Sequence, residues 1–91
     1  MIQNFRSKEL ANLWSGRRSR IDSRLHGRII VRLDALNAAS RPEDMNLPGY
    51  DFHMLQGFDP TRYTVHVNGA WCITFAFEGG NAQAVDFENY H

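Results

Sequence analysis

Apolar residues recur at two different spacings along this chain, and the spacing changes near residue 50. Before that point they fall three or four positions apart, which is the period of a helix with one buried face. After it they alternate with polar residues, which is typical of strands whose two sides meet different surroundings. Helices followed by strands predict an α+β fold, with two N-terminal helices packed on a mostly antiparallel sheet.

The first half of the sequence predicts one short strand and two helices. Residues 2–5 are a candidate strand, and Ser7 is a suitable N-cap for a first helix that Gly16 would end. Ser19 resembles the start of a capping box for a second, longer helix that reaches residues 38–40. The apolar stripe of that second helix recurs at intervals of three and four residues: Ile21, Leu25, Ile29, Leu33 and Leu36.

Four strands are predicted in the second half, after a loop over residues 41–49 that contains two prolines. Turns that contain glycine or lie beside it separate these strands. The predicted strand ranges are 50–55, 63–67, 71–77 and 83–88. With the strand at the start of the chain, the predicted order is β-α-α-β-β-β-β over a single domain of residues 1–91.

The turn at Asn68-Gly69 decides which residues share a face of the sheet. A three-residue loop, with Gly69 at positive φ, separates apolar from polar positions better than a two-residue loop does. The face expected to pack on the helices would then hold Tyr63, Val65, Trp71, Ile73 and Phe75. The opposite face, expected to be open to a ligand, would hold Arg62, Thr64, His66, Cys72 and Thr74.

The composition argues against several classes of protein. A chain of 91 residues suits one domain with one core. Its lone cysteine, Cys72, cannot form an internal disulfide, which fits a reducing compartment. The first residues do not resemble a signal peptide, and no stretch approaches the ~20 apolar residues of a membrane span. We therefore expect a cytoplasmic protein that does not associate with membranes.

The net charge is zero, but the two halves of the chain carry opposite charge. Residues 1–41 hold nine of the ten basic residues and three acidic ones, whereas residues 42–91 hold one basic residue and seven acidic ones. The halves therefore carry charges of +6 and −6. This asymmetry indicates either a polyanionic or acidic partner for the first half, or mutual neutralisation of the halves after folding.

A series of short motifs runs in a fixed order through the second half. The series consists of Leu47-Pro48-Gly49, His53-x-Leu55-x-Gly57, Trp71-x-Ile73-x-Phe75 and the final Tyr90-His91. Together with the opening Met1-Ile2 and the predicted order of elements, it resembles the HigB branch of the RelE toxin superfamily, the plasmid maintenance killer toxins. The resemblance implies a RelE-like fold, which is similar to that of small microbial RNases.

That resemblance also implies a function, as the toxin of a type II toxin-antitoxin system. Such toxins are endoribonucleases that cleave messenger RNA in the ribosomal A site, and they need neither a metal ion nor a cofactor. A HigA-like helix-turn-helix antitoxin neutralises them. The implied partners are this antitoxin, the 70S ribosome and messenger RNA, with operator DNA reached only through the antitoxin.

By position, His53, Tyr90 and His91 match the family's catalytic residues. Metal-free RNA cleavage needs an activated 2′-oxygen, a stabilised phosphorane and a protonated 5′-oxygen. Histidine suits the proton transfers, and an aromatic ring can stack on a base. The alternatives are a solvated strand histidine at position 53, and a tail at Tyr90-His91 that only caps the edge of the core.

Several positions depart from the residues that the family usually has. Gln56 replaces a lysine, Cys72 and His66 each replace an arginine, and Asn89 replaces an aspartate. Cations that would face the scissile phosphate are therefore missing, although His66 and Arg62 could partly replace them. We expect a slow or altered nuclease. The alternative is a degenerate homologue that acts mainly as an antitoxin partner and co-repressor.

Four arginines of the predicted second helix would line one helical face, because they are spaced by four: Arg20, Arg24, Arg28 and Arg32. A basic face of this kind could contact the backbone of ribosomal RNA or an acidic stretch of the antitoxin. The alternative is a solvated face, neutralised by nearby carboxylates.

Two other chemistries could use the same residues. His53, His66 and His91 with Asp51 could form a zinc site, although no closely spaced ligand pair marks one. Cys72 could act as a nucleophile if His66 lowered its pKa, although a lone cysteine in an apolar strand usually only packs. An unrelated small enzyme on this scaffold is a further possibility.

Overall fold

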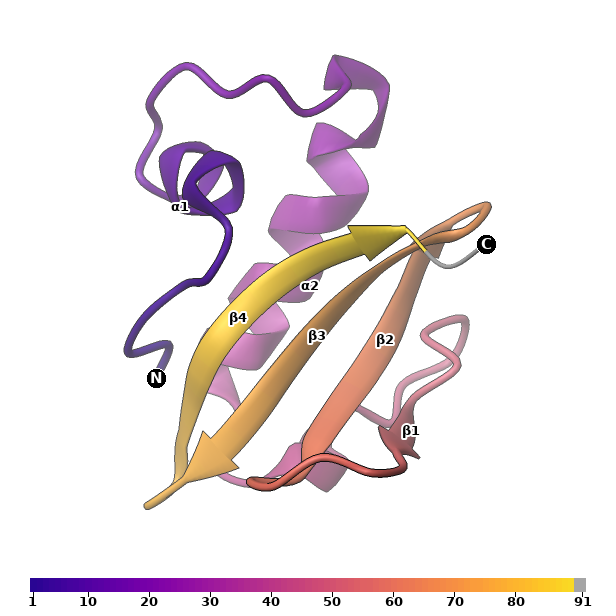
Figure 1. Cartoon of the computed structure of the whole chain (residues 1–91). Coiled ribbons are helices and arrows are strands. Elements are labelled where there is room, and N and C mark those ends of the chain that lie inside the picture. Colours follow the sequence, from indigo (N-terminus) through magenta and orange to yellow (C-terminus); the bar gives the residue numbers. More distant parts are fainter. Residues whose placement is uncertain (90–91) are drawn as a thin grey trace.

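A curved, four-stranded antiparallel sheet lies in front of the longer helix in Figure 1. The computed structural model describes residues 1–89. The strands are hydrogen-bonded in chain order: β1 (His53–Leu55), β2 (Arg62–Asn68), β3 (Trp71–Glu78) and β4 (Asn81–Asn89). The helical elements precede them: α1 (Lys8–Trp14), the 3-10 turn η1 (Ser23–Leu25), α2 (His26–Ala38) and the 3-10 turn η2 (Pro42–Met45). The predicted α+β class is confirmed.

The first helix begins and ends where the sequence predicted. The hydroxyl of Ser7 accepts a hydrogen bond from the Leu10 amide at 3.1 Å, which caps the free N–H groups of α1. Gly16 follows the helix at φ +76°, a left-handed conformation that glycine adopts without strain.

The predicted start of the second helix is wrong by several residues. The hydroxyl of Ser19 accepts from the Ile21 amide at 3.3 Å and donates to the carbonyl of Glu9 at 2.8 Å, in a segment that precedes the helix. The first cap is Asp22, whose carboxylate accepts from the Arg24 amide at 3.0 Å and opens η1. The α-helix itself begins at His26 and ends at Ala38, as predicted for its C-terminal end.

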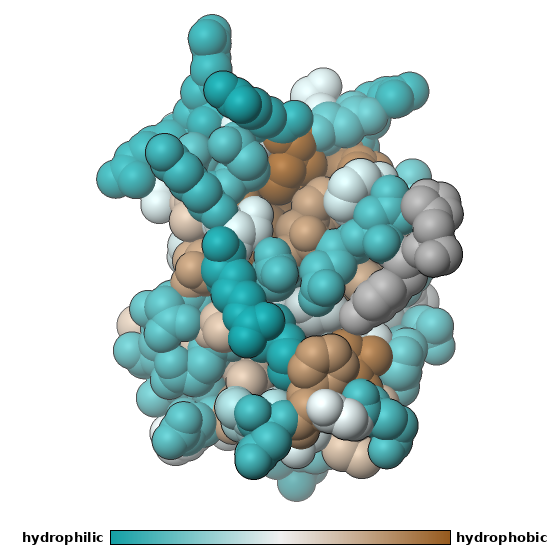
Figure 2. All heavy atoms as spheres, in the orientation of Figure 1, coloured by the Kyte–Doolittle hydropathy of each residue, from teal (hydrophilic) through white to brown (hydrophobic). Residues whose placement is uncertain are grey.

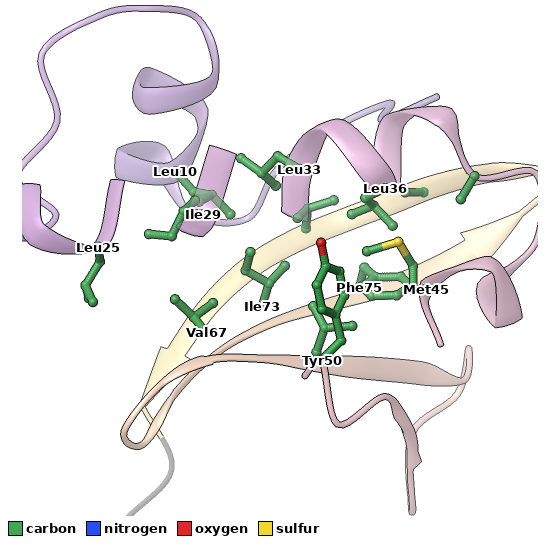
Figure 3. Close-up of a cluster of buried hydrophobic side chains, with 14 residues drawn as sticks. Leu10, Leu25, Ile29, Leu33, Leu36, Met45, Tyr50, Val67, Ile73 and Phe75 are labelled. Atoms are coloured by element: carbon green, nitrogen blue, oxygen red, sulfur yellow. The ribbon is translucent and has the colours of Figure 1, made fainter. Parts of the chain in front are cut away.

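The core lies between α2 and the sheet, as Figure 3 shows. Of the predicted helical stripe, four residues are buried, whereas Ile21 is half-buried and precedes the helix. The buried side chains come from α1, η1 and α2, and from the helix-facing side of β2 and β3. They include Leu10, Leu25, Ile29, Leu33, Leu36, Val65, Val67, Ile73 and Phe75. The apolar pattern therefore identified the packed face correctly.

Residues 2–5 do not form the full strand that the sequence predicted. They make two isolated parallel bridges along the outer edge of β4, from Ile2 to Ala82 and from Phe5 to Val85. A continuous ladder is interrupted beside this segment, where β4 has a register shift against β3 and Ala84 adopts φ +49°. The segment nevertheless covers an edge of the sheet that would otherwise be unpaired.

The register predicted for the β2–β3 hairpin is confirmed, but its turn is different. Val65 pairs with Ile73 and His66 with Cys72, as a three-residue loop would require. The register then shifts after His66, so that Asn68 pairs with Trp71 across a two-residue turn. A bulge therefore supplies the shift that the prediction assigned to the loop. Gly69 has the expected positive φ, at +57°.

The strand predicted over 50–55 is reduced to three residues. Tyr50 is buried in the core, and its carbonyl accepts a hydrogen bond of 2.6 Å from the His66 amide. Asp51 then turns the chain at φ +46°, a left-handed conformation that is uncommon for a residue other than glycine. Because of this turn, regular pairing with β2 begins only at His53.

No helix within residues 1–89 is long and apolar enough to cross a membrane.

Candidate active site

A hollow of about 200 Å³ opens on the face of the sheet that points away from α2. Figure 2 looks onto this face in the orientation of Figure 1. The lining comes from the segment around β1, from β2, from the start of β3 and from the turn that joins β2 to β3. The lining residues are Asp51, His53, Thr64, His66, Gly69, Ala70, Trp71 and Cys72.

The strand register explains why these side chains meet. His53 on β1 is the cross-strand partner of Thr64 on β2, and His66 on β2 is the partner of Cys72 on β3. Thr64 and His66 are two residues apart, so they point to the same face. Cross-strand partners of an antiparallel pair have neighbouring side chains. Three of the residues predicted for the site, His53, His66 and Cys72, are therefore brought together.

The imidazole of His53 is held in one tautomer by the backbone before it. Its Nδ1 lies 2.9 Å from the carbonyl oxygen of Asp51, which can only accept a hydrogen bond, so Nδ1 carries the proton. The left-handed turn at Asp51 accompanies this contact. The side chain is exposed, and its Nε2 is left as an acceptor that can take a proton from a bound group.

The imidazole of His66 is fixed in the opposite tautomer. Its Nε2 donates to the carbonyl oxygen of Gly69 at 2.9 Å, so its Nδ1 is the remaining acceptor. The backbone of His66 is anchored on both sides, because its amide donates to Tyr50 and its carbonyl accepts from Arg32 Nε at 2.6 Å. The hollow thus contains two imidazoles with different free nitrogens.

Cys72 is buried, and its thiol makes a hydrogen bond of 3.5 Å to the carbonyl oxygen of Glu88. Its predicted position beside His66 is confirmed by the pairing of the two residues. The His66 imidazole, however, donates to Gly69. A cysteine buried in a strand usually only packs, and a nucleophilic role for Cys72 stays a prediction.

The prediction that this face of the sheet is open to a ligand holds only at the hollow. Arg62, Thr64, Cys72 and Thr74 are all buried, and only His66 among the five predicted residues is half-exposed. Side chains of neighbouring strands are hydrogen-bonded to one another on this face. One guanidinium nitrogen of Arg62 donates to the hydroxyl of Thr74 and to the carbonyl oxygen of Ala84, each at 2.9 Å, and the Thr74 hydroxyl donates to the Glu88 carboxylate.

Two further predicted residues lie outside the hollow. Gln56 is exposed in the turn after β1 and does not contribute to the lining. Asn89 lines a neighbouring pocket of about 440 Å³, which it shares with Trp71. Trp71 borders both pockets and stacks on Phe87 with ring centroids 4.6 Å apart. Tyr90 and His91, which were predicted to be catalytic, lie outside the described residues.

The four arginines predicted to share a helical face do not do so, because the helix begins at His26. Arg20 lies in an irregular segment and Arg24 in the 3-10 turn. The Arg24 guanidinium lies 2.7 Å from the carboxylate of Asp22, and its hydrogen bonds lower the pKa of that carboxyl to about 2. Arg28 is exposed on α2. Figure 2 shows hydrophilic side chains that project from the end of the molecule holding residues 17–24.

Arg32 has a structural position that the sequence did not reveal. It is 9% exposed, and its guanidinium carbon lies 4.4 Å from the centre of the Tyr50 ring. Burial lowers the pKa of this guanidinium. Since it also donates to the carbonyl of His66, Arg32 joins α2 to the strand that carries the site. The only sign of this position in the sequence was that Arg32 lies three residues after Ile29, and therefore close to the apolar stripe of the helix.

Thr64 is a lining residue that the sequence placed on the correct face but did not identify as a site residue.

Within residues 1–89, no group of three or more histidine, cysteine or carboxylate side chains is arranged to hold a metal ion. The zinc hypothesis also included His91, which lies outside that range.

The sequence has clear relatives among known proteins. A family described as the RelE-like toxin of type II toxin-antitoxin system HigB matches residues 3–91. The chain is also 33% identical, over 92 aligned positions, to a protein of Proteus vulgaris named endoribonuclease HigB. That alignment covers 100% of both chains.

Proposed function

Because the chain belongs to the family of HigB-like, RelE-like toxins of type II toxin-antitoxin systems, we propose that it is an endoribonuclease that cleaves messenger RNA on the ribosome. The observation that carries the proposal is the hollow in which His53 Nε2 is left as a proton acceptor beside a second imidazole. The name of the Proteus vulgaris relative supports the type of reaction.

The proposed reaction needs two proton transfers and no metal ion. His53 Nε2 accepts the proton of the ribose 2′-hydroxyl, and the 2′-oxygen forms a bond to the adjacent phosphorus. The bond between phosphorus and the 5′-oxygen breaks, and His91 gives that oxygen its proton. The products are a 2′,3′-cyclic phosphate and a 5′-hydroxyl. In this proposal Tyr90 stacks on a base next to the cleaved bond. Asn89, which precedes Tyr90 in the sequence, belongs to the same group of catalytic residues.

The phosphate receives little help from fixed positive charge. Gln56 and Cys72 are neutral at positions where the family resemblance implies lysine and arginine. Arg62 is 3% exposed and donates to Thr74 and Ala84, so its guanidinium is held within the sheet. His66 lines the hollow, and we propose that its imidazole contacts the phosphate there. We therefore propose a nuclease slower than relatives with a lysine and an arginine, because a missing donor costs about 10²–10³-fold in rate.

The burial of Arg62 and the neutral Cys72 favour one alternative function. A weakly active or non-catalytic homologue would still act as an antitoxin partner and co-repressor. In both cases we propose a HigA-like antitoxin as the partner, operator binding only through it, and a cytoplasmic location. Contact with ribosomal RNA is proposed for Arg20, Arg24 and Arg28 but not for Arg32, which is buried.

Induced expression in bacteria, with primer-extension mapping of the cleaved messages, tests the proposal. We expect growth arrest and cuts within translated codons for the wild-type protein, and loss of both for His53→Ala. His26→Ala is the matched control, because His26 bonds to the Ile21 carbonyl outside the hollow. Cleavage by His53→Ala at the wild-type rate would contradict the proposed role of this residue.

The double substitution Gln56→Lys/Cys72→Arg separates the slow nuclease from the non-catalytic alternative. We expect cleavage to rise by about tenfold or more if the missing cations limit the rate. The comparison requires that the variant still folds, which circular dichroism can check, because Cys72 is 5% exposed. An unchanged cleavage rate in a folded double variant would show that phosphate charge is not limiting.

A further inference from the structure

Thr64 has a buried hydroxyl that the fold itself leaves unsatisfied. The residue is 2% exposed and lines the hollow. Within residues 1–89, its Oγ1 is the one buried side-chain nitrogen or oxygen without a hydrogen-bond partner. Leaving a buried hydroxyl unpaired costs about 1–3 kcal/mol, so such a group in a native protein needs an explanation.

Its cross-strand partner Thr74 provides an internal comparison. Thr64 and Thr74 pair between β2 and β3 and point to the same face. The Thr74 hydroxyl accepts from Arg62 at 2.9 Å and donates to the Glu88 carboxylate. The sheet therefore supplies partners for one threonine and none for the other. Because valine fills the same volume without a polar atom, packing alone does not require a threonine at position 64.

The position of Thr64 in the sheet places this residue among those that line the hollow. It pairs with His53 on β1 and lies two residues before His66 on β2, with all three on one face. Among the described residues, the lining of the hollow includes no lysine or arginine. A phosphate bound there must therefore be held by the imidazoles and by neutral donors, and a threonine hydroxyl can donate a hydrogen bond.

We propose that Thr64 binds the substrate by donating its hydroxyl proton to a non-bridging oxygen of the scissile phosphate. This inference rests on the proposed nuclease function and adds a residue to its site. The hydrogen bond becomes stronger as negative charge develops on the phosphorane, so it contributes to the rate of cleavage as well as to binding. The hydroxyl that has no partner within residues 1–89 is then a donor available to the substrate.

Three variants test the inference. Thr64→Val removes the hydroxyl and keeps the volume, Thr64→Ser keeps the hydroxyl, and Thr74→Val is the matched control on the neighbouring strand. We expect Thr64→Val to unfold at the wild-type temperature or higher, because no hydrogen bond is lost. Its cleavage rate should fall by about 10- to 100-fold, and Thr64→Ser should recover most of it. Thr74→Val should unfold at a lower temperature, because the hydrogen bonds of Arg62 and Glu88 are lost.

A binding measurement keeps the test independent of catalysis. Adenosine 3′-monophosphate carries the phosphate next to a free 2′-hydroxyl, and its affinity can be followed by NMR titration. Weaker binding to Thr64→Val, restored in Thr64→Ser, supports the inference even if the wild-type protein cleaves no RNA, an outcome that would remove the proposed function alone. Wild-type cleavage and binding in Thr64→Val, or a loss of stability equal to that of Thr74→Val, would overturn it.

Discussion

The two faces of the sheet are almost equally buried, but they exclude water in different ways. On the face toward α2, Val65, Ile73 and Phe75 pack against helical side chains. On the opposite face no helix is present within residues 1–89, yet Arg62 and Thr74 are 3% and 0% exposed. Hydrogen bonds link polar groups of the strands on that second face. Apolar packing stabilises the first face, and hydrogen bonds between polar groups stabilise the second.

This difference explains where a site can form. Every cavity in an apolar core lowers stability, so an unfilled position is not expected there. A polar face can leave one group without a partner if a ligand later supplies it, at a cost to the stability of the free protein. The hollow around Thr64 is the place where the polar pairing of this sheet is incomplete.

The largest effect is expected on the helix-facing side. Phe75→Ala removes a fully buried ring from the core, and we expect the free energy of unfolding to fall by about 3–5 kcal/mol. Urea denaturation followed by circular dichroism measures this loss. Phe58→Ala is the control, because that ring is 51% exposed. Equal losses for the two variants would show that the helix-facing side is not the main source of stability.

A smaller loss is expected when the polar pairing of the other face is broken. Arg62→Met keeps much of the side-chain volume but removes the hydrogen bonds to Thr74 and Ala84, so we expect a loss of about 2 kcal/mol. The same denaturation experiment applies. If this variant were as stable as the wild type, the second face would owe its closure to packing alone, and the contrast between the two faces would fail.

The smallest effect is expected at Asp22, which belongs to neither face and is exposed. Its pKa is about 2 in the folded protein, below the ordinary value of 3.8, because Arg24 donates hydrogen bonds to it. Its contribution to stability is therefore present above pH ~4 and is lost as the pH falls toward 2. Asp22→Asn should unfold at a slightly lower temperature than the wild type at pH 6, and this difference should shrink between pH 4 and pH 2.

Local sequence signals predicted much of this fold correctly. The cap at Ser7, the end of α1 at Gly16 and the register of β2 on β3 depend on neighbouring residues, and each was found. The start of α2 was placed too early, because Ser19 has its hydroxyl bonded to Glu9, ten positions away along the chain. A local pattern cannot reveal such a contact.

The candidate site was predictable only in part. Family resemblance and residue type pointed to His53, and the alternation of β2 put His66 on the correct face. The burial of Arg62 could not be predicted, because it depends on a carbonyl of β4 at Ala84. The role inferred for Thr64 depends on the absence of a partner within the described chain, which only three-dimensional positions can show.

The bridges between residues 2–5 and β4 have a consequence for how the protein is made. Asn4 accepts a hydrogen bond from the Ala84 amide, 80 positions further along the chain. Synthesis proceeds from the N-terminus, so the opening segment can pair with β4 only after the intervening residues have been made. A protein proposed to act on ribosomes thus covers the β4 edge of its sheet only after β4 itself has been synthesised.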